Sequence, residues 1–267
     1  MERVSPAAVE KDFYLTRLIW TLAEHFGDQL LLKGGTLLCK VDVGFHRMSE
    51  DVDMIIPLAG STHKRDNAKR MDQVRDALRK IAPAVGVKLQ HPEGERHERH
   101  THVVWHLDYE SAFGPQGIIV EVSMRPRLRP ARKSSLRQLL ADALIGDYAP
   151  AYCWALDAME ARAEKVRAAF TRTAGRDFYD LGLLAAEGVD LQSPEFIELV
   201  DQKLAELASP PISAFPTPFN LAGERRKQVD ASLAADLPAV LRYGEPSLNL
   251  DELLRKFEQL WRFLRQK

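Results

Sequence analysis

Paired carboxylates stand out first among the residues of this 267-residue sequence that could support chemistry. Asp51 and Asp53 lie in the segment DVDMIIPL, whose alternating pattern predicts a strand with both carboxylates on one face. Two like charges so placed favour a cation, and Mg²⁺ typically takes one or two carboxylates together with water and substrate phosphates. Exposed aspartate pairs are also common at strand starts without any function, so the spacing alone leaves both interpretations open.

Paired glycines supply the second feature. Gly34 and Gly35 follow a short apolar segment, 30–32, and begin a segment compatible with a helix up to about Lys40. Glycines at a helix start expose backbone N–H groups, and the partial positive charge there favours phosphate. The structural alternative is a tight turn that requires a positive φ. A phosphate-binding turn followed by an Asp-x-Asp strand would bring a polyphosphate beside metal ligands, as phosphoryl and nucleotidyl transfer require.

The elements that must position these residues change in type along the chain. Alternating and helical patterns in the first part predict an α/β (α+β) domain over 1–156, a mixed sheet with flanking helices, and the second part predicts a helical domain over 157–267. The expected strands are 30–32, 51–58, 85–90, 101–109, 117–124 and 152–156. The expected helices are 5–26, 33–40, 63–81, 135–144, 157–172, 178–187, 193–207, 224–241 and 250–265.

Composition narrows the class of protein. The formal net charge is -1, so any binding to nucleic acid must depend on a local patch. Cys39 and Cys153 are the two cysteines, which is too few for a disulfide framework, and no apolar stretch approaches the roughly 20 residues of a membrane span. We therefore expect a cytoplasmic protein without a membrane partner.

A basic stretch, RPRLRPARK, is the candidate for such a patch. Its prolines exclude a regular helix and should hold its basic side chains out toward a partner, although a solvated linker is the alternative. The five basic residues are Arg125, Arg127, Arg129, Arg132 and Lys133.

Histidines offer a competing metal site. Five of them cluster in sequence, but a zinc site normally needs a closed set of nitrogen or sulfur ligands, and no cysteine lies nearby. Surface imidazoles near a nucleotide or RNA pocket are the favoured interpretation. The five are His91, His97, His100, His102 and His106.

Two blocks of sequence carry a resemblance to a known family. The early block runs from Glu10-Lys11-Asp12 through Lys33-Gly34-Gly35-Thr36 to the segment 47–53, RMSEDVD, and the late block holds the segment 164–168, EKVRA, with Arg172 and the segment 176–181, RDFYDL. In this order they resemble the AbiEii toxin family of nucleotidyltransferases, within the DNA polymerase beta-like superfamily. The tail after about Gly188 carries no resemblance.

The resemblance implies roles for particular residues. Metal binding would fall to Asp51 and Asp53, triphosphate binding to Gly35 and Thr36, and further essential positions to Lys165 and Asp177. The full set implied for the nucleotide is Lys33, Gly34, Gly35, Thr36, Arg47, Ser49 and Lys165, and the implied catalytic set is Asp51, Asp53, Lys165 and Asp177. Family patterns often have serine after the paired glycines, and Thr36 keeps the hydroxyl. A solvated lysine and a helix-capping or salt-bridged aspartate remain the structural alternatives for Lys165 and Asp177.

A third carboxylate usually comes from a neighbouring strand in this superfamily. Glu121 is the candidate, because an ionisable residue within GIIVEVS is costly unless it is exposed or paired with a cation. An exposed structural glutamate is the alternative.

The expected activity is transfer of a nucleoside monophosphate from a nucleoside triphosphate to an acceptor hydroxyl, with Mg²⁺ or Mn²⁺ as cofactor. The family points to the 3′ end of tRNA, or another RNA, as acceptor, and to an antitoxin protein as partner in a toxin–antitoxin or phage-defence system. The alternatives are a nucleotidyltransferase that modifies a small molecule or a protein, and an inactive binding protein with the same fold.

Overall fold

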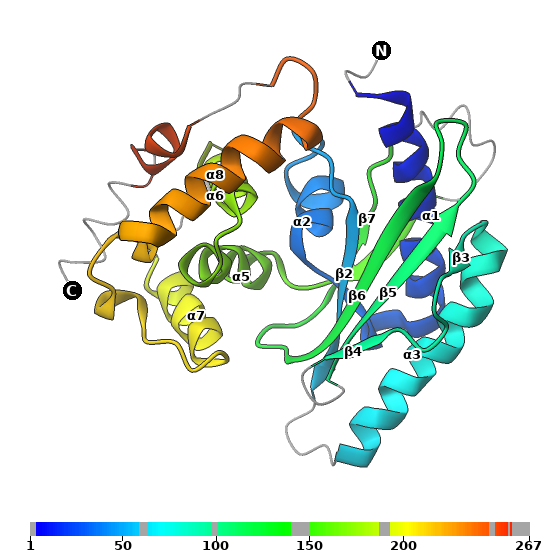
Figure 1. Ribbon diagram of the computed structural model, residues 1–267. Coiled ribbons are helices and arrows are strands. Elements are labelled where there is room, and N and C mark those ends of the chain that lie inside the picture. The colour runs from blue at the N-terminus through cyan, green and yellow to red at the C-terminus, as the bar shows by residue number, and fades with distance from the viewer. Residues whose placement is uncertain are drawn as a thin grey trace. The chain divides into compact units, whose positions relative to one another are not determined.

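A computed structural model describes residues 4–58, 64–97, 101–139, 150–186, 193–245, 249–255 and 257. By its contacts the chain divides into two compact units, Met1–Asp157 and Ala158–Lys267. The first unit contains a mixed sheet with flanking helices, and the second is built of helices (Figure 1). The predicted α/β fold class is confirmed. None of the helices in the described ranges combines the length and apolar character needed to cross a bilayer.

The first unit alternates helices and strands. Its α-helices are α1 (Pro6–Phe26), α2 (Gly34–Leu37) and α3 (Lys64–Val85), its 3₁₀ helix is η1 (Gly27–Gln29), and its π-helix is η2 (Leu38–Asp42). Its strands are β1 (Leu31–Leu32), β2 (Asp51–Leu58), β3 (Lys88–Leu89), β4 (Glu95–His97), β5 (His102–Tyr109), β6 (Gln116–Pro126), β7 (Arg132–Ser135) and β8 (Tyr152–Ala155).

These strands form one sheet. The order within the described residues is β3-β5-β6-β2-β1-β8-β7, with β4 paired to β5. β2 runs parallel to β6, and β1 runs parallel to β8, whereas the other pairs are antiparallel. β6 lies between β5 and β2 and pairs with each of them along eight residues, so Glu121 on β6 is held by paired strands on both sides.

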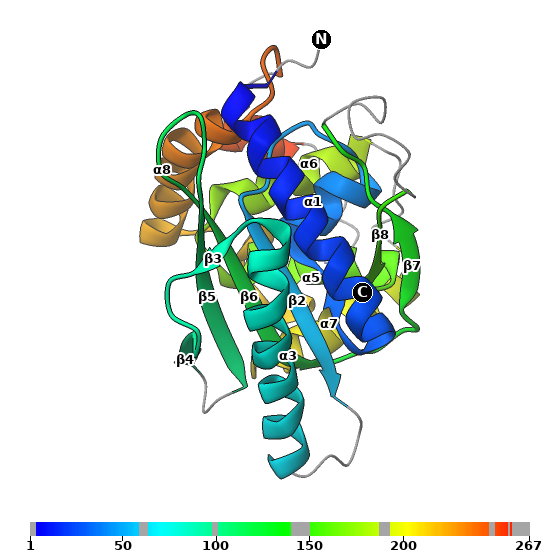
Figure 2. The same ribbon diagram turned by 90° about the vertical axis from the view of Figure 1, so that its right-hand side faces the viewer.

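Helices α1 and α3 cover one face of this sheet (Figure 2). Pro6 begins α1 at a position that needs no N–H donor, and the Ser5 hydroxyl accepts a hydrogen bond from Ala8 N. On β2, Val52 and Met54 are fully buried, while Asp51 and Asp53 alternate with them and are half-buried. Strand alternation therefore places the two aspartates on the face opposite the buried valine and methionine.

The second unit packs its helices around an aromatic core. The elements are α5 (Ala158–Thr171), α6 (Gly175–Ala186), α7 (Pro194–Ala205), η4 (Ile212–Ala214), η5 (Pro218–Asn220) and α8 (Gly223–Val240), with further helical residues at 250–255. Phe219 contacts the rings of Phe170 and Phe178 at centroid distances of 5.1 and 5.5 Å. Arg225 donates to the carbonyl oxygens of Ala169 and Arg172, which satisfies acceptors at the end of α5.

One predicted element is wrong, and another is shorter than predicted. The segment 135–144 was expected to be a helix, but β7 includes Ser135, residues 136–139 are irregular, and the rest lies outside the described residues. Non-local partners take the N–H groups there, since Leu136 N donates to Ala151 O and Arg137 N donates to Lys40 O. The strand expected at 85–90 is reduced to β3, because α3 continues to Val85.

Candidate active site

The glycine turn and the aspartate strand are in direct contact. Gly34 has a φ of +70°, and a Cβ added to it would overlap the Oδ2 atom of Asp53. Lys33 N donates to Asp53 O at 2.9 Å, and Lys33 Nζ lies 3.9 Å from Asp53 Oδ1. Only a residue without a side chain fits at Gly34, so the first helical turn of α2 lies beside the carboxylate.

Glu121 lies next to Asp53 across the parallel pair of β2 and β6. The register pairs Asp53 with Glu121 and Asp51 with Ile119. Neighbouring strands are about 4.8 Å apart, and paired residues point to the same face. The structure therefore brings Asp53 and Glu121 side by side, with Asp51 one step along the same face.

Buried or half-buried polar side chains contact the glycine turn. They are Thr36, Arg47 and Ser49. Thr36 is fully buried, and its hydroxyl donates to the backbone carbonyl of Asp51 and lies 2.8 Å from Ser49 Oγ. Arg47 is also buried and donates to Met48 O at 2.9 Å. A Cβ added to Gly35 would lie 2.7 Å from Arg47 Nη2 and 3.3 Å from Ser49 Oγ. The Thr36 hydroxyl thus joins α2 to the start of β2 instead of facing an open site.

Carboxylate oxygens on Asp53 and Glu121 fit a hard divalent ion by their chemistry and by their register. As the side chains stand, no three histidine, cysteine, aspartate or glutamate side chains within the described ranges are grouped to hold an ion. Side-chain rotation, water and substrate oxygens would have to complete the coordination, which is the usual case for Mg²⁺.

His102 lies beside this acidic pair, and the histidines form no closed metal site within the described ranges, which leave out His100. His97 pairs with His102 across β4 and β5, and their ring centroids are 5.4 Å apart. His102 Nε2 lies 2.6 Å from Glu121 Oε1. Sequence reasoning missed this contact, although the alternation of 101–109 already put His102 and His106 on one face.

Lys165 and Asp177 form an ion-pair cluster within the second unit. The Lys165 ammonium on α5 lies 2.9 Å from Asp177 Oδ1 and 2.9 Å from Asp180 Oδ2, both on α6. Asp180 is fully buried, and the side chains of Lys165 and Asp177 are 11% and 8% exposed. The lysine is therefore not a solvated surface residue, because it offsets two carboxylates that are largely removed from water.

Lys165→Met is expected to lower the free energy of unfolding of the second unit by about 3 kcal/mol, because it removes the cation that both carboxylates contact. Urea unfolding followed by circular dichroism measures the change. Lys227→Met is the matched control, since Lys227 is 80% exposed and lies 3.8 Å from Glu224. Equal stability of the two variants would contradict a structural role for the cluster.

Internal contacts hold several side chains of the basic stretch. Arg129 Nε lies 3.1 Å from Asp157 Oδ1, and Arg132 Nε donates to Leu156 O at 3.0 Å. Lys133 Nζ lies 3.7 Å from the ring centroid of Tyr152. The expectation that prolines hold the arginines out toward a partner is wrong for Arg129 and Arg132, because both are half-buried and bonded within the first unit. Lys133 is exposed and lies over the Tyr152 ring. Arg127 is exposed.

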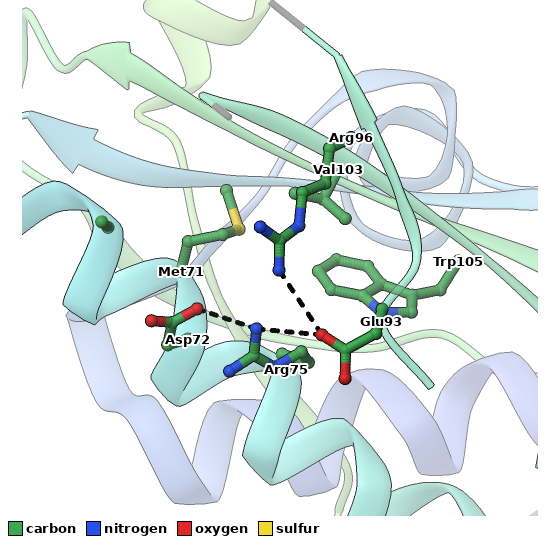
Figure 3. A pocket seen from close by; sticks show the side chains of 8 residues that line it. Met71, Asp72, Arg75, Glu93, Arg96, Val103 and Trp105 are labelled. Atoms are coloured by element: carbon green, nitrogen blue, oxygen red, sulfur yellow. Dashed lines mark hydrogen bonds and ion pairs between the residues drawn. The ribbon is translucent and has the colours of Figure 1, made fainter. Parts of the chain in front are cut away.

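A separate cavity of about 160 Å³ lies between α3 and the β4–β5 pair (Figure 3). Its wall includes Trp105, which alternates along β5 with the histidines, so the cavity is on the opposite face of the sheet from Glu121. Its two arginines are neutralised internally, since Arg75 Nη1 and Arg96 Nη2 lie 3.2 and 3.4 Å from Glu93 Oε2. We do not assign it to the candidate site.

Comparisons with known proteins give the family of the chain. The family model described as nucleotidyl transferase AbiEii toxin, type IV toxin–antitoxin system, matches residues 17–262, which includes the tail after Gly188 that carried no resemblance by inspection. A comparison with curated proteins gives no match.

Solved structures show the same fold. The nucleotidyltransferase toxin MenT4 from Mycobacterium tuberculosis superposes with a TM-score of 0.68 at 19% identity, covering 97% of this chain and 84% of that one. JHP933 from Helicobacter pylori superposes with a TM-score of 0.57 at 15% identity, covering 98% of this chain and 94% of that one. Because the family model spans most of the sequence, the chain belongs to the AbiEii family of nucleotidyltransferase toxins.

Proposed function

We propose that this nucleotidyltransferase moves a nucleoside monophosphate from a nucleoside triphosphate to an acceptor hydroxyl at the site formed by Gly34, Asp53 and Glu121. The observation that supports the proposal is the contact of the glycine turn with Asp53, together with the register that puts Glu121 beside it. A phosphate-binding turn and a pair of carboxylates are the parts that transfer of a nucleotidyl group requires.

The candidate-site residues near the glycine turn have different roles in this proposal. The backbone N–H groups of Gly34 and Gly35 bind the triphosphate at the start of α2, where the partial positive charge favours anions. Lys33, 3.9 Å from Asp53, lies within reach of the same phosphates. Thr36, Arg47 and Ser49 hold the turn in place through the contacts described above.

Asp51, Asp53 and Glu121 would hold Mg²⁺ or Mn²⁺. When bound, the ion supplies a lowered pKa for the attacking hydroxyl and charge stabilisation for the departing pyrophosphate. The acceptor oxygen forms a bond to the α-phosphorus as the bond to the bridging oxygen breaks. In the second unit, Lys165 and Asp177 are proposed as further essential residues, as the resemblance to the family implies.

We propose the 3′ end of tRNA as the acceptor, an antitoxin protein as partner, and the cytoplasm as the location. Membership of a toxin family supports the antitoxin partner and a role in a toxin–antitoxin or phage-defence system. The basic stretch gives limited support for RNA, since three of its residues make internal contacts, and Arg127 and Lys133 are its exposed members.

Incubation of the purified protein with Mg²⁺, each labelled nucleoside triphosphate in turn and total RNA tests the proposal. We expect label from one or two nucleotides to enter an RNA band of tRNA size, and chelation of the metal to stop the transfer. If the label instead enters protein or a small molecule, the proposed acceptor is wrong, but the proposed reaction, transfer of a nucleotidyl group, still holds. Absence of transfer to any acceptor, in the presence of bound nucleotide, would instead indicate a binding protein.

A further inference from the structure

An imidazole contacts the carboxylate that lies beside Asp53. His102 Nε2 is 2.6 Å from Glu121 Oε1, and the two residues come from the paired strands β5 and β6. In this pair Val104 is directly opposite Glu121, so His102 is its diagonal neighbour on the same face. Glu121 therefore has His102 on the β5 side and Asp53 on the β2 side.

The contact leaves one carboxylate oxygen available. The side chains of His102 and Glu121 are 18% and 37% exposed. Within the described ranges, Glu121 Oε2 has no hydrogen bond or ion pair. In this rotamer Nε2 is buried and makes no aligned hydrogen bond to a described residue. The 2.6 Å separation is within hydrogen-bonding distance, so a small change in the side-chain torsions of either residue is what alignment of the N–H requires.

We propose that His102 is a positioning residue for Glu121. It holds Oε1 and thereby leaves Oε2 directed to the ion that Asp53 and Glu121 share. The inference rests on the proposed function, since it takes Glu121 as a metal ligand. A free glutamate loses rotamer freedom when it binds an ion, and a partner that fixes it beforehand reduces that loss. Outer-shell partners of this kind change metal affinity by about 10–100-fold.

Binding of Mn²⁺ alone to the full-length protein, measured by electron paramagnetic resonance without nucleotide, tests the proposal. His102→Gln keeps an N–H donor at similar reach, whereas His102→Leu keeps the bulk and loses the donor. We expect Mn²⁺ to bind His102→Leu about tenfold more weakly than wild type, and His102→Gln to bind it close to wild type. His106→Leu is the matched control, because His106 lies on the same strand and face but is opposite Ile119.

Glu121→Gln separates the two ways in which the proposal can fail. Weak Mn²⁺ binding by Glu121→Gln with wild-type binding by His102→Leu would overturn the role of His102 and keep the ligand assignment. Wild-type binding by Glu121→Gln would overturn the ligand assignment itself. If His102→Leu does not fold, His102→Asn takes its place, since the shorter amide does not reach Glu121 and the expected loss is the same. In the transfer assay, the apparent KM for Mn²⁺ should rise while kcat at saturating metal stays close to wild type.

Discussion

Asp53→Asn is expected to lower nucleotide transfer by ~10³-fold or more, which corresponds to about 4 kcal/mol of lost transition-state stabilisation. The substitution preserves the shape of the side chain and the backbone bond from Lys33 N to Asp53 O. It removes the charge that lies between Lys33 and the neighbouring Glu121. Because the acidic pair would then lack one member, the site could no longer bind a divalent ion strongly. Incorporation of labelled nucleotide into RNA measures the effect.

Asp108→Asn is the control for this substitution. Asp108 lies on β5, on the same face of the sheet, and accepts a hydrogen bond from Gln90 Nε2 at 2.8 Å. Near-wild-type transfer by Asp108→Asn shows that loss of a carboxylate on this face is not by itself harmful. If Asp53→Asn retained full activity, Asp53 would not be part of the reaction centre, and the site would have to be sought elsewhere.

Local patterns were sufficient for the parts of the site that lie within one element. The strand 51–58 was predicted with its observed bounds, and the alternation of Asp51 and Asp53 with apolar residues indicated a common face. The predicted antiparallel pair, 101–109 and 117–124, is present as β5 and β6. Each of these predictions depends on a period of two along a short segment, which side-chain burial enforces directly.

Relations between distant segments could not be obtained in this way. That Glu121 pairs with Asp53 depends on the register of β2 against β6, which the packing of the whole sheet decides. The failed helix at 135–144 has the same cause, because Asp12 Oδ2 accepts a hydrogen bond from Leu139 N at 2.9 Å. Asp12 also pairs with Lys40, whose pKa is lowered by burial, and this buried pair joins α1 to η2. No sequence pattern within residues 135–144 indicates that this segment bonds to these distant residues.

Gly34→Ala is expected to lower nucleotide transfer by ~100-fold, because displacement of a catalytic group by about 1 Å has an effect of that size. A methyl group at Gly34 would overlap Asp53 Oδ2, so the carboxylate must move away from the turn or the turn away from β2. The positive φ adds a conformational cost of about 1 kcal/mol to the folded state. The transfer assay and urea unfolding, measured on the same preparation, give the two quantities separately.

Gly27→Ala is the control that separates the loss of folding free energy, caused by a side chain at positive φ, from the loss of transfer activity. Gly27 ends α1 with a φ of +58°, and a Cβ added there meets nothing within 4 Å. The variant should lose about 1 kcal/mol or more of folding free energy while keeping its activity in the folded fraction. A Gly34→Ala protein that is folded yet inactive, beside a Gly27→Ala protein that is destabilised yet active, would show that the close approach of the turn to Asp53 is required for transfer. Equal activity in the two variants would mean that the turn tolerates a side chain, and that the phosphate-binding role of Gly34 is wrong.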